Sequence, residues 1–402
     1  MFHIVIYALR LRGVANWVPG LSLEKMSSEL LGPWYRAVES PGEAQEDLLH
    51  RLLQVYSRTE LGRRRGSERI QTMEEFRECF PVMTYDGFRP YLQLVQQGRY
   101  QALLPEDPFY FALTSGTRGP PKQIPLTQTD MDDRKRVAAR TLAHFAATHG
   151  GFSFMDGYDL NVHFPSIMGS VRAGDKDLPA GYISGIFAKL LFEPLGIRPA
   201  PTVGEMDAMG APLSTREWSR VMDQVYGMTK DKDITMAIGS PFGLFMLGFY
   251  FKRKMRVLPR QLWKMKVLFC AGLPQIHEAY EKPLKKMFGE TVEVYEMYGA
   301  SEGMFAIQLD HKPFITPFYD TYLFEVITSS GVKMLHELRR GEWGQLVVSS
   351  PIFPRYNIED LVECCLPGLY FKVFGRDTPL TVATHHGHRL ARALIESFVG
   401  LF

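Results

Sequence analysis

The stretch from Phe111 to Thr127, FALTSGTRGPPKQIPLT, changes abruptly from apolar residues to small, hydroxylated and cationic ones. Phe111–Leu113 is typical of the end of a buried strand. The residues that follow offer backbone N–H groups and hydroxyls that no bulky side chain blocks. They are Thr114, Ser115, Gly116, Thr117 and Gly119. Because Lys122 adds a positive charge, the composition predicts a cradle for phosphate groups.

Two prolines separate the glycines of this cradle from its lysine. Pro120 and Pro121 fix φ at about −65° and remove two backbone donors, so the cradle is expected to be stiff, as a preorganised anion site requires. A P-loop kinase is disfavoured, because no glycine directly precedes Lys122 and Gln123 follows it. A surface turn of small residues with an incidental lysine is the alternative.

A second cluster, YGASEG at residues 298–303, follows an expected strand at Thr291–Met297. Tyr298 offers an aromatic face for a base, Ser301 a hydroxyl for phosphate and Glu302 a carboxylate for Mg²⁺. This chemistry complements that of the cradle. The alternative is a turn that carries a solvated glutamate.

A third region, Gly341–Leu361, begins with a tight turn and the strand GQLVVSS and ends in PRYNIEDLV. Asp360 can accept two hydrogen bonds from ribose hydroxyls. An aspartate that caps a helix or a turn explains the residue equally well.

The elements that must position these residues alternate between strand and helix. Ile234–Ile238 is a β-like run followed by a helix with Phe242 and Phe245, whose apolar face is interpreted as core, with an apolar ligand wall as the alternative. Val267–Cys270 is a short buried strand, after which Pro274 starts a helix running toward Phe288. Such alternation indicates a mostly parallel sheet, whose ligands gather at the carboxyl ends of its strands.

The remaining chain supplies a lead-in and connections. Residues 1–100 are predicted to be mainly helical, with one helix over Thr72–Phe80 capped by Thr72. A helix after Thr127 gives the order strand, cradle, helix, which predicts an anion near the start of that helix. Asp159–Phe164 is expected to be a strand and Gly169–Gly185 a loop.

Composition indicates an ordinary globular protein. The chain has 402 residues, of which 46% are hydrophobic and 22% charged, and its net charge of +2 argues against nucleic acid or anionic membrane as the main partner. Four cysteines without CxxC spacing suit a reducing cytoplasm. No window reaches the roughly 18 apolar residues of a spanning helix, and the opening run FHIVIYAL is expected to be a strand or helix and not a signal.

Together the motifs resemble those of the acyl-adenylate-forming enzymes, in the same order and rough spacing. They are TSGTRGPPK, CAGLP, YGASEG, GEWGQLVVSS followed by RYNIEDLV, and FGRD. The earlier segments TELGRRRG and MEEFRECFPVMTYDGFRPYL are similar to one branch, the Gretchen Hagen (auxin-responsive) family of acyl-acid amide synthetases. The resemblance spans most of the chain and implies an α/β fold with a small β subdomain.

The resemblance also implies an ATP–Mg²⁺ site. Its phosphate-holding residues would be Ser115, Gly116, Thr117, Gly119 and Lys122. Its other members would be Ala271 and Gly272 beside the adenine, Tyr298 on the base, Ser301 at the α-phosphate, Asp360 at the ribose and Arg376 in a hinge. Glu302 would hold Mg²⁺, and Lys122 and Glu302 are assigned catalytic roles. Phe242 and Phe245 are assigned to an acyl pocket.

The implied reaction activates a small carboxylic acid with ATP to an acyl-adenylate, which an amino acid or amine then attacks to give an amide. Thioester formation with coenzyme A is the enzyme alternative. A nucleotide- or acyl-binding protein without full turnover is the non-enzyme alternative. An acid-panel assay of ATP–pyrophosphate exchange, followed by product analysis with an amine or coenzyme A, separates the three.

Two departures from the family pattern stand out. Glu359 occupies a position where the ribose-binding motif usually has glycine, and the sequence stops at Phe402, soon after FGRD, whereas the family continues into a mobile lid domain. We therefore expect a helical lead-in at 1–100, an adenylation core at 101–374, and a hinge with a lid remnant at 375–402. Adenylation is expected to outpace transfer unless a separate protein supplies a lid. The histidines His385, His386 and His388 have no evident companion ligands for a metal.

Overall fold

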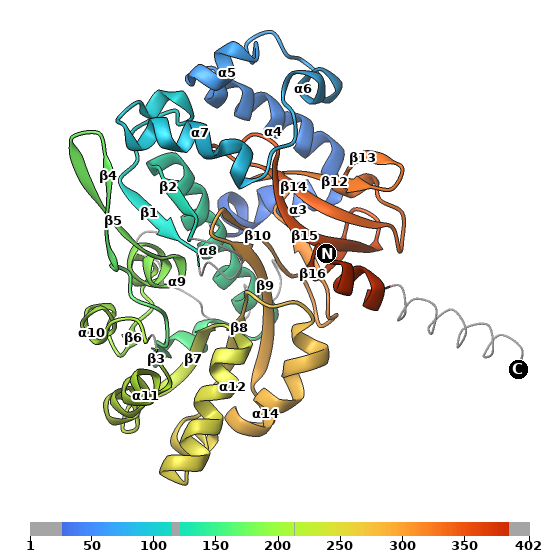
Figure 1. Cartoon of the computed structure of the whole chain (residues 1–402). Coiled ribbons are helices and arrows are strands. Elements are labelled where there is room, and N and C mark those ends of the chain that lie inside the picture. Colours follow the sequence, from blue (N-terminus) through green and yellow to red (C-terminus); the bar gives the residue numbers. More distant parts are fainter. Residues whose placement is uncertain (1–25, 115–120, 213, 386–402) are drawn as a thin grey trace, which may run out of the picture.

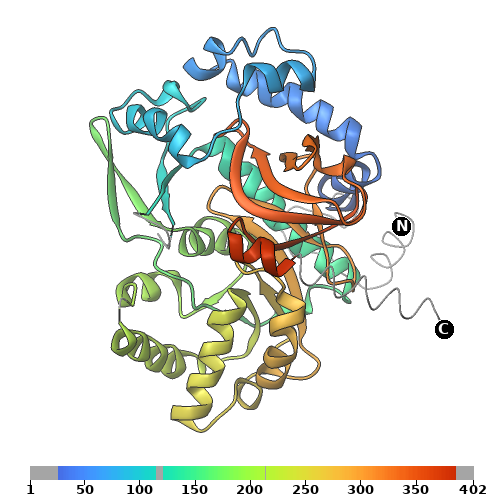
Figure 2. The same cartoon turned by 45° about the vertical axis from the view of Figure 1, so that its right-hand side comes forward.

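The computed structural model describes residues 26–114, 121–212 and 214–385 of the chain (Figure 1). Helices from the first quarter of the sequence lie at one end of the molecule. A long sheet extends from them toward a second group of helices at the opposite end (Figures 1 and 2). The described residues 26–100 are mainly helical, as predicted from the sequence, while the division of the chain into a lead-in, core and hinge stays a prediction.

The amino-terminal helices are α3 (Gly32–Glu39), α4 (Pro41–Tyr56), α5 (Glu60–Arg64), α6 (Met73–Cys79) and α7 (Tyr85–Gln96), after a π-helical turn at Met26–Leu31. The stripe that α4 buries is Leu48, Leu49, Leu52, Leu53 and Tyr56. The predicted cap of α6 is present, because Thr72 Oγ1 accepts a hydrogen bond from Glu75 N at 3.2 Å and the Glu75 carboxylate accepts one from Thr72 N.

A four-stranded sheet carries the two ends of the cradle. Its order is β2-β1-β5-β4, with β1 (Tyr110–Leu113), β2 (Gln123–Leu126), β4 (Gly169–Ala173) and β5 (Lys176–Tyr182). β1 and β2 are antiparallel, so the cradle joins two strands of a hairpin. The predicted order of strand, cradle and helix is therefore wrong, because β2 intervenes before α8 (Gln128–Thr148). The expected loop at Gly169–Gly185 is also wrong, since β4 and β5 form a second hairpin there.

A twelve-stranded sheet forms the centre of the molecule, and its first part is parallel. The parallel strands lie in the order β6-β3-β7-β8-β9. They are β3 (Tyr158–Leu160), β6 (Pro199–Ala200), β7 (Ile234–Gly239), β8 (Val267–Cys270) and β9 (Glu293–Ala300). β3 is shorter than the predicted strand. The neighbouring helices are α10 (Val203–Met209), α11 (Thr215–Thr229), α12 (Pro241–Tyr250), α13 (Pro259–Leu262) and α14 (Lys282–Phe288). The helix expected from Pro274 begins later, with a π-helical turn at His277–Glu281.

The rest of this sheet is antiparallel, so the parallel sheet predicted from the sequence is confined to its first part. These strands are β10 (Gly303–Gln308), β11 (Ile315–Pro317), β12 (Leu323–Thr328), β13 (Gly331–Met334), β14 (Trp343–Ser349), β15 (Tyr356–Leu366) and β16 (Tyr370–Arg376). β9 and β10 form a tight hairpin that links the two parts. α8 and the short α9 (Ile183–Phe187) contribute buried side chains to the core that joins the lead-in to this region.

A buried ion pair ties the antiparallel strands to the lead-in. Glu325 on β12 is 1% exposed and accepts hydrogen bonds from Arg355 Nε and Arg77 Nε, both at 2.8 Å. Arg355 Nη1 also donates to the carbonyl oxygens of Arg77, at 3.1 Å, and Phe80, at 2.7 Å. Because these carbonyls lie at the carboxyl end of α6, the arginine fixes the start of β15 against the helical end of the molecule.

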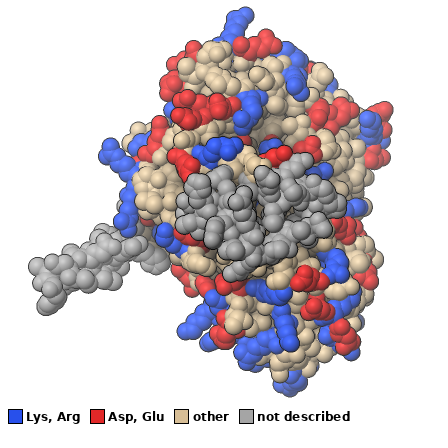
Figure 3. Space-filling view, turned by 180° about the vertical axis from the view of Figure 1, so that it is seen from behind, with Lys and Arg blue, Asp and Glu red and all other residues tan. Residues whose placement is uncertain are grey.

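Charged side chains of both signs are interspersed on the face seen in Figure 3. Over the part of the chain that the structure describes, no helix has the length and apolar character needed to cross a membrane.

Replacing Glu325 with glutamine should lower the free energy of unfolding by about 3–5 kcal/mol, because the change leaves the buried Arg355 guanidinium without its counter-charge. Urea unfolding followed by fluorescence measures the loss. Asp86→Asn is the control, since the Asp86–Arg89 pair is exposed and should contribute about 1 kcal/mol or less. Equal losses in the two variants would contradict the anchoring role of Glu325.

Candidate functional site

The two ends of the cradle are held together by paired hydrogen bonds. Lys122 N donates to Thr114 Oγ1 at 2.9 Å, and Thr114 N donates to Lys122 O at 3.1 Å. Gln123 N donates to the hydroxyl of Tyr85 at 3.0 Å, which fixes the first residue of β2 against α7. The predicted phosphate-binding residues Ser115, Gly116, Thr117 and Gly119 lie outside the described residues.

The Lys122 ammonium joins the cradle to the second predicted cluster. Its nitrogen lies 5.4 Å from the ring centre of Tyr85 and 5.7 Å from that of Tyr356. Lys122 Nζ donates to the Tyr356 hydroxyl at 3.0 Å, and that hydroxyl donates to Glu302 Oε1 at 2.7 Å. The structure therefore brings Lys122 and Glu302 to one site.

Tyr298, Asp360 and Arg376 also converge. The Tyr298 hydroxyl donates to Asp360 Oδ2 at 2.8 Å, and Arg376 Nε lies 2.9 Å from Asp360 Oδ1. Burial raises the pKa of the Asp360 carboxyl above its ordinary value, and the Arg376 guanidinium opposes that shift. Asp360 lies within β15 and pairs with Arg376 on β16, so the interpretation of a capping aspartate is wrong. To bind Asp360, ribose hydroxyls would have to replace the Tyr298 hydroxyl or the Arg376 guanidinium as its hydrogen-bond donors.

Ser301 rests on a buried arginine that the sequence analysis missed. Arg134 Nη2 donates to the Ser301 carbonyl oxygen at 3.1 Å, and Arg134 Nε pairs with Asp130 Oδ2 at 2.7 Å. Both charged side chains are fully buried. Arg134 Nη1 has no hydrogen-bond partner among the described residues, which leaves a buried donor beside the Ser301–Glu302 turn. The spacing of four residues between Asp130 and Arg134 on a predicted helix is the signal that could have indicated the pair.

The residues predicted at the adenine follow β8. Ala271 N donates to the Gly239 carbonyl oxygen at 3.0 Å, and Gly272 has φ +86°, a left-handed conformation that favours glycine. Both lie at the carboxyl end of the parallel strands, as does the turn after β9. Their contact with adenine stays a prediction.

The predicted acyl-pocket residues lie on α12, which follows β7. Phe242 is 52% exposed, and Phe245 is half-buried against the core formed with α11 and α14. Their role in binding an acid also stays a prediction.

Glu302 is the one predicted metal ligand. Its side chain is largely buried. Its Oε1 accepts a hydrogen bond from the Tyr356 hydroxyl, while its Oε2 accepts none from the described residues. Within the described residues, no group of three or more His, Cys, Asp or Glu side chains could hold a metal ion. A single carboxylate whose second oxygen has no hydrogen bond from the described residues fits Mg²⁺ that arrives on nucleotide phosphates, because Mg²⁺ commonly keeps several ligands from substrate and water.

His385 packs inside the antiparallel region. Its ring is stacked on Phe374 with centres 3.9 Å apart, and its Nε2 lies 3.2 Å from Glu363 Oε2. His386 and His388 lie outside the described residues.

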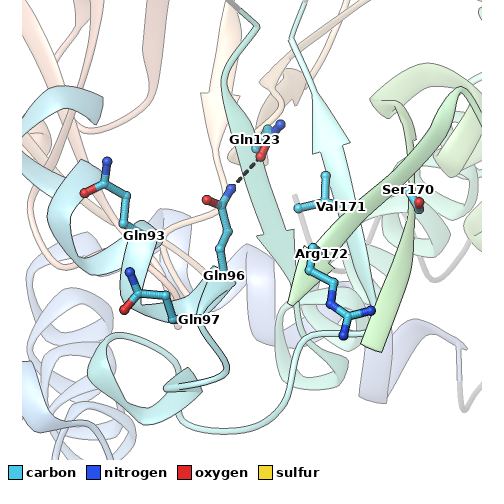
Figure 4. A pocket seen from close by; sticks show the side chains of 7 residues that line it. All are labelled: Gln93, Gln96, Gln97, Gln123, Ser170, Val171 and Arg172. Atoms are coloured by element: carbon cyan, nitrogen blue, oxygen red, sulfur yellow. Dashed lines mark hydrogen bonds between the residues drawn. The ribbon is translucent and has the colours of Figure 1, made fainter. Parts of the chain in front are cut away.

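A polar cavity of about 630 Å³ lies beside the cradle but is not lined by any predicted site residue (Figure 4). Its lining residues are Gln93, Gln96, Gln97, Gln123, Ser170, Val171 and Arg172. Gln96 Nε2 donates to Gln123 Oε1 at 2.5 Å across it. Since the lining has no carboxylate, the cavity is unsuited to a metal ion.

Comparisons with known proteins match the amino-terminal part of the chain to one family. Residues 33–190 match the GH3 family N-terminal domain. Jasmonoyl–L-amino acid synthetase JAR6 of Nicotiana attenuata is 27% identical over 104 residues. That alignment covers 25% of this chain and 18% of the relative, so the chain spans only a small part of the curated protein's length.

Solved structures share the fold at low sequence identity. AtGH3.15 acyl acid amido synthetase in complex with 2,4-DB has a TM-score of 0.69 and 15% identity, over 87% of this chain and 70% of that one. An open conformation of 2-hydroxyisobutyryl-CoA ligase in complex with 2-HIB-AMP and CoA has a TM-score of 0.57 and 17% identity, over 82% and 74% of the two chains.

Glu359 adopts the backbone that its expected glycine would favour, with φ +67°. This conformation strains the backbone of a non-glycine residue by roughly 1–2 kcal/mol. Replacing Glu359 with glycine would relieve this strain, but the greater freedom of glycine in the unfolded chain offsets part of that stabilisation. Glu359→Gly should therefore stabilise the protein by about 0.5–1 kcal/mol in urea unfolding. Glu359→Ala removes the same carboxylate but keeps the strained Cβ. Equal stability of the two variants would exclude backbone strain as the reason.

Proposed function

Because residues 33–190 match the GH3 family N-terminal domain and the fold is shared with adenylate-forming enzymes, we propose that this chain activates a carboxylic acid with ATP. The observation that carries the proposal is the hydrogen-bonded chain from Lys122 through Tyr356 to Glu302. It joins a cation suited to phosphate with a carboxylate suited to Mg²⁺. The two groups come from segments that are 180 residues apart in the sequence.

In the proposed reaction, an oxygen of the acid's carboxylate bonds to the α-phosphorus of ATP, and pyrophosphate leaves. Two anions must approach each other, so the site has to compensate charge and hold the groups in line. Lys122 would donate to phosphate oxygens, and Arg134 would hold the Ser301–Glu302 turn in place by its hydrogen bond to the Ser301 carbonyl oxygen. Mg²⁺ held by Glu302 would neutralise charge on the phosphates.

We propose an amino acid or another amine as the second substrate. Its nitrogen would attack the acyl carbon, and AMP would leave as the amide forms. The similarity to proteins described as an acyl acid amido synthetase and a jasmonoyl–L-amino acid synthetase supports this acceptor. Thioester formation is the second candidate, because the fold is also that of a CoA ligase. The four cysteines are free, which supports a reducing, cytoplasmic setting.

The deciding experiment is ATP–pyrophosphate exchange over a panel of carboxylic acids. Exchange that requires one acid supports adenylation. Incubation of that acid with amino acids or with coenzyme A then separates amide from thioester by mass spectrometry. ATP binding without exchange for any acid would favour a binding protein instead.

Lys122→Ala should slow exchange by at least about tenfold, or roughly 1.4 kcal/mol in activation free energy, because the variant loses the cation that faces the phosphates. The measurement is kcat/KM for ATP with an acid that supports exchange. Lys176→Ala is the control, since Lys176 lies exposed at the tip of the β4–β5 hairpin. Unchanged kinetics in Lys122→Ala would remove this residue from the mechanism.

Glu302→Gln should raise the Mg²⁺ concentration needed for half-maximal exchange by about tenfold, because a neutral amide is a weaker ligand for Mg²⁺ than a carboxylate. A Mg²⁺ titration at fixed ATP measures the shift. Glu290→Gln is the control, because Glu290 is exposed to solvent. If Glu302→Gln and the wild type share one Mg²⁺ dependence, Glu302 is a structural residue of the turn.

A further inference from the structure

Tyr356 stands between two opposite charges that do not touch each other. Lys122 Nζ and Glu302 Oε1 each lie within 3.0 Å of the Tyr356 hydroxyl oxygen. Their charged atoms nevertheless form no ion pair within 4.0 Å, although both residues are described. The phenol therefore occupies the position that a direct contact would otherwise take.

The direction of the two hydrogen bonds is fixed by chemistry. An ammonium can only donate and a carboxylate can only accept, so the phenol accepts from Lys122 and donates to Glu302. Tyr356 is 1% exposed, so its hydroxyl is buried between the two charged groups. The ring is packed against Phe88 and Phe353, with centres 6.0 and 5.0 Å away.

The backbone beside Tyr356 is held as well. Met83 N donates to the Arg355 carbonyl oxygen at 3.1 Å, and Asn357 N donates to the Met83 carbonyl oxygen at 2.8 Å. The hydroxyl therefore has little freedom to leave its place between the charges.

Two other trios of lysine, tyrosine and carboxylate in the described residues behave differently. Their members are Lys254, Tyr250 and Asp223 in one, and Lys312, Tyr370 and Asp310 in the other. In each, the tyrosine hydroxyl again bonds both charged groups, but the lysine nitrogen also contacts the carboxylate directly, at 2.6 Å in the first trio and 3.4 Å in the second. The same three chemical groups thus close into an ion pair elsewhere in this chain and stay apart at the candidate site.

We propose that Tyr356 is a positioning residue that keeps Lys122 and Glu302 from pairing with each other. An ion pair would occupy the ammonium that a phosphate needs and the carboxylate that Mg²⁺ needs, and its attraction would be strong in a partly buried site. With the phenol in place, an incoming nucleotide displaces single hydrogen bonds. The proposal rests on the proposed function, because it takes ATP–Mg²⁺ as the ligand.

The test is Tyr356→Phe, which keeps the ring and removes the hydroxyl. ATP binding is measured by calorimetry in EDTA, so that no metal contributes. We expect affinity to fall at least fivefold, because Lys122 would pair with Glu302. Adding Glu302→Gln to Tyr356→Phe should restore affinity to the level of Glu302→Gln alone, since a neutral amide cannot hold the lysine. Tyr250→Phe removes a hydroxyl from the matching surface trio and should leave binding unchanged.

Crystals of the Tyr356→Phe protein supply a readout that is independent of nucleotide. A Lys122 Nζ to Glu302 oxygen distance under 4.0 Å is expected, and a longer distance overturns the proposal. Unchanged ATP affinity in Tyr356→Phe, or a loss that Glu302→Gln does not rescue, also overturns it. If the wild type binds no ATP, the proposed function fails, and the crystal distance alone decides whether Tyr356 separates the charges.

Discussion

The buried contact between Arg355 and Glu325 is the constraint on which the candidate site depends. Arg355 has φ +48°, and it keeps this unfavourable backbone while its side chain is bound by Glu325 and by two carbonyls of the lead-in. Tyr356 is the next residue, so the same anchor sets where its hydroxyl lies. Lys122 reaches that hydroxyl from a hairpin and Glu302 from the turn after β9, which makes the site a junction of three separately built parts.

The local features of this junction could be predicted from the sequence. The strand before the cradle, the strand that leads to the Ser301–Glu302 turn and the strand GQLVVSS can each be predicted from a short segment of sequence. The structure has β1, β9 and β14 at those places, although β9 extends through Tyr298 to Ala300. The parallel strands could also be predicted, because β7 and β8 are short apolar runs with helices between them. The family resemblance then supplied roles that spacing alone leaves open.

The partners of these residues could not be predicted, because their contacts join distant segments. Nothing near Lys122 indicates that Tyr356, 234 residues later, accepts its hydrogen bond. The hairpin of β1 and β2 was missed because four residues of strand after the cradle are too few to show a period of two. Glu359 is the opposite case: the glycine expected there pointed to a special backbone, and its φ of +67° is special.

Charge balance supports the proposal that this site uses Mg²⁺ together with a nucleotide. The described side chains around it include three cations, Lys122, Arg134 and Arg376, and three anions, Glu302, Asp130 and Asp360. Asp130 already neutralises Arg134, and Asp360 neutralises Arg376. Among the described residues Lys122 has no such carboxylate partner, because its ammonium donates to the Tyr356 hydroxyl and lies over the ring of Tyr85. A nucleoside triphosphate bound here would bring several negative charges to the Lys122 ammonium and to Glu302, a carboxylate that repels them. We therefore expect Mg²⁺ to strengthen nucleotide binding, because it would convert Glu302 from a repelling group into a ligand.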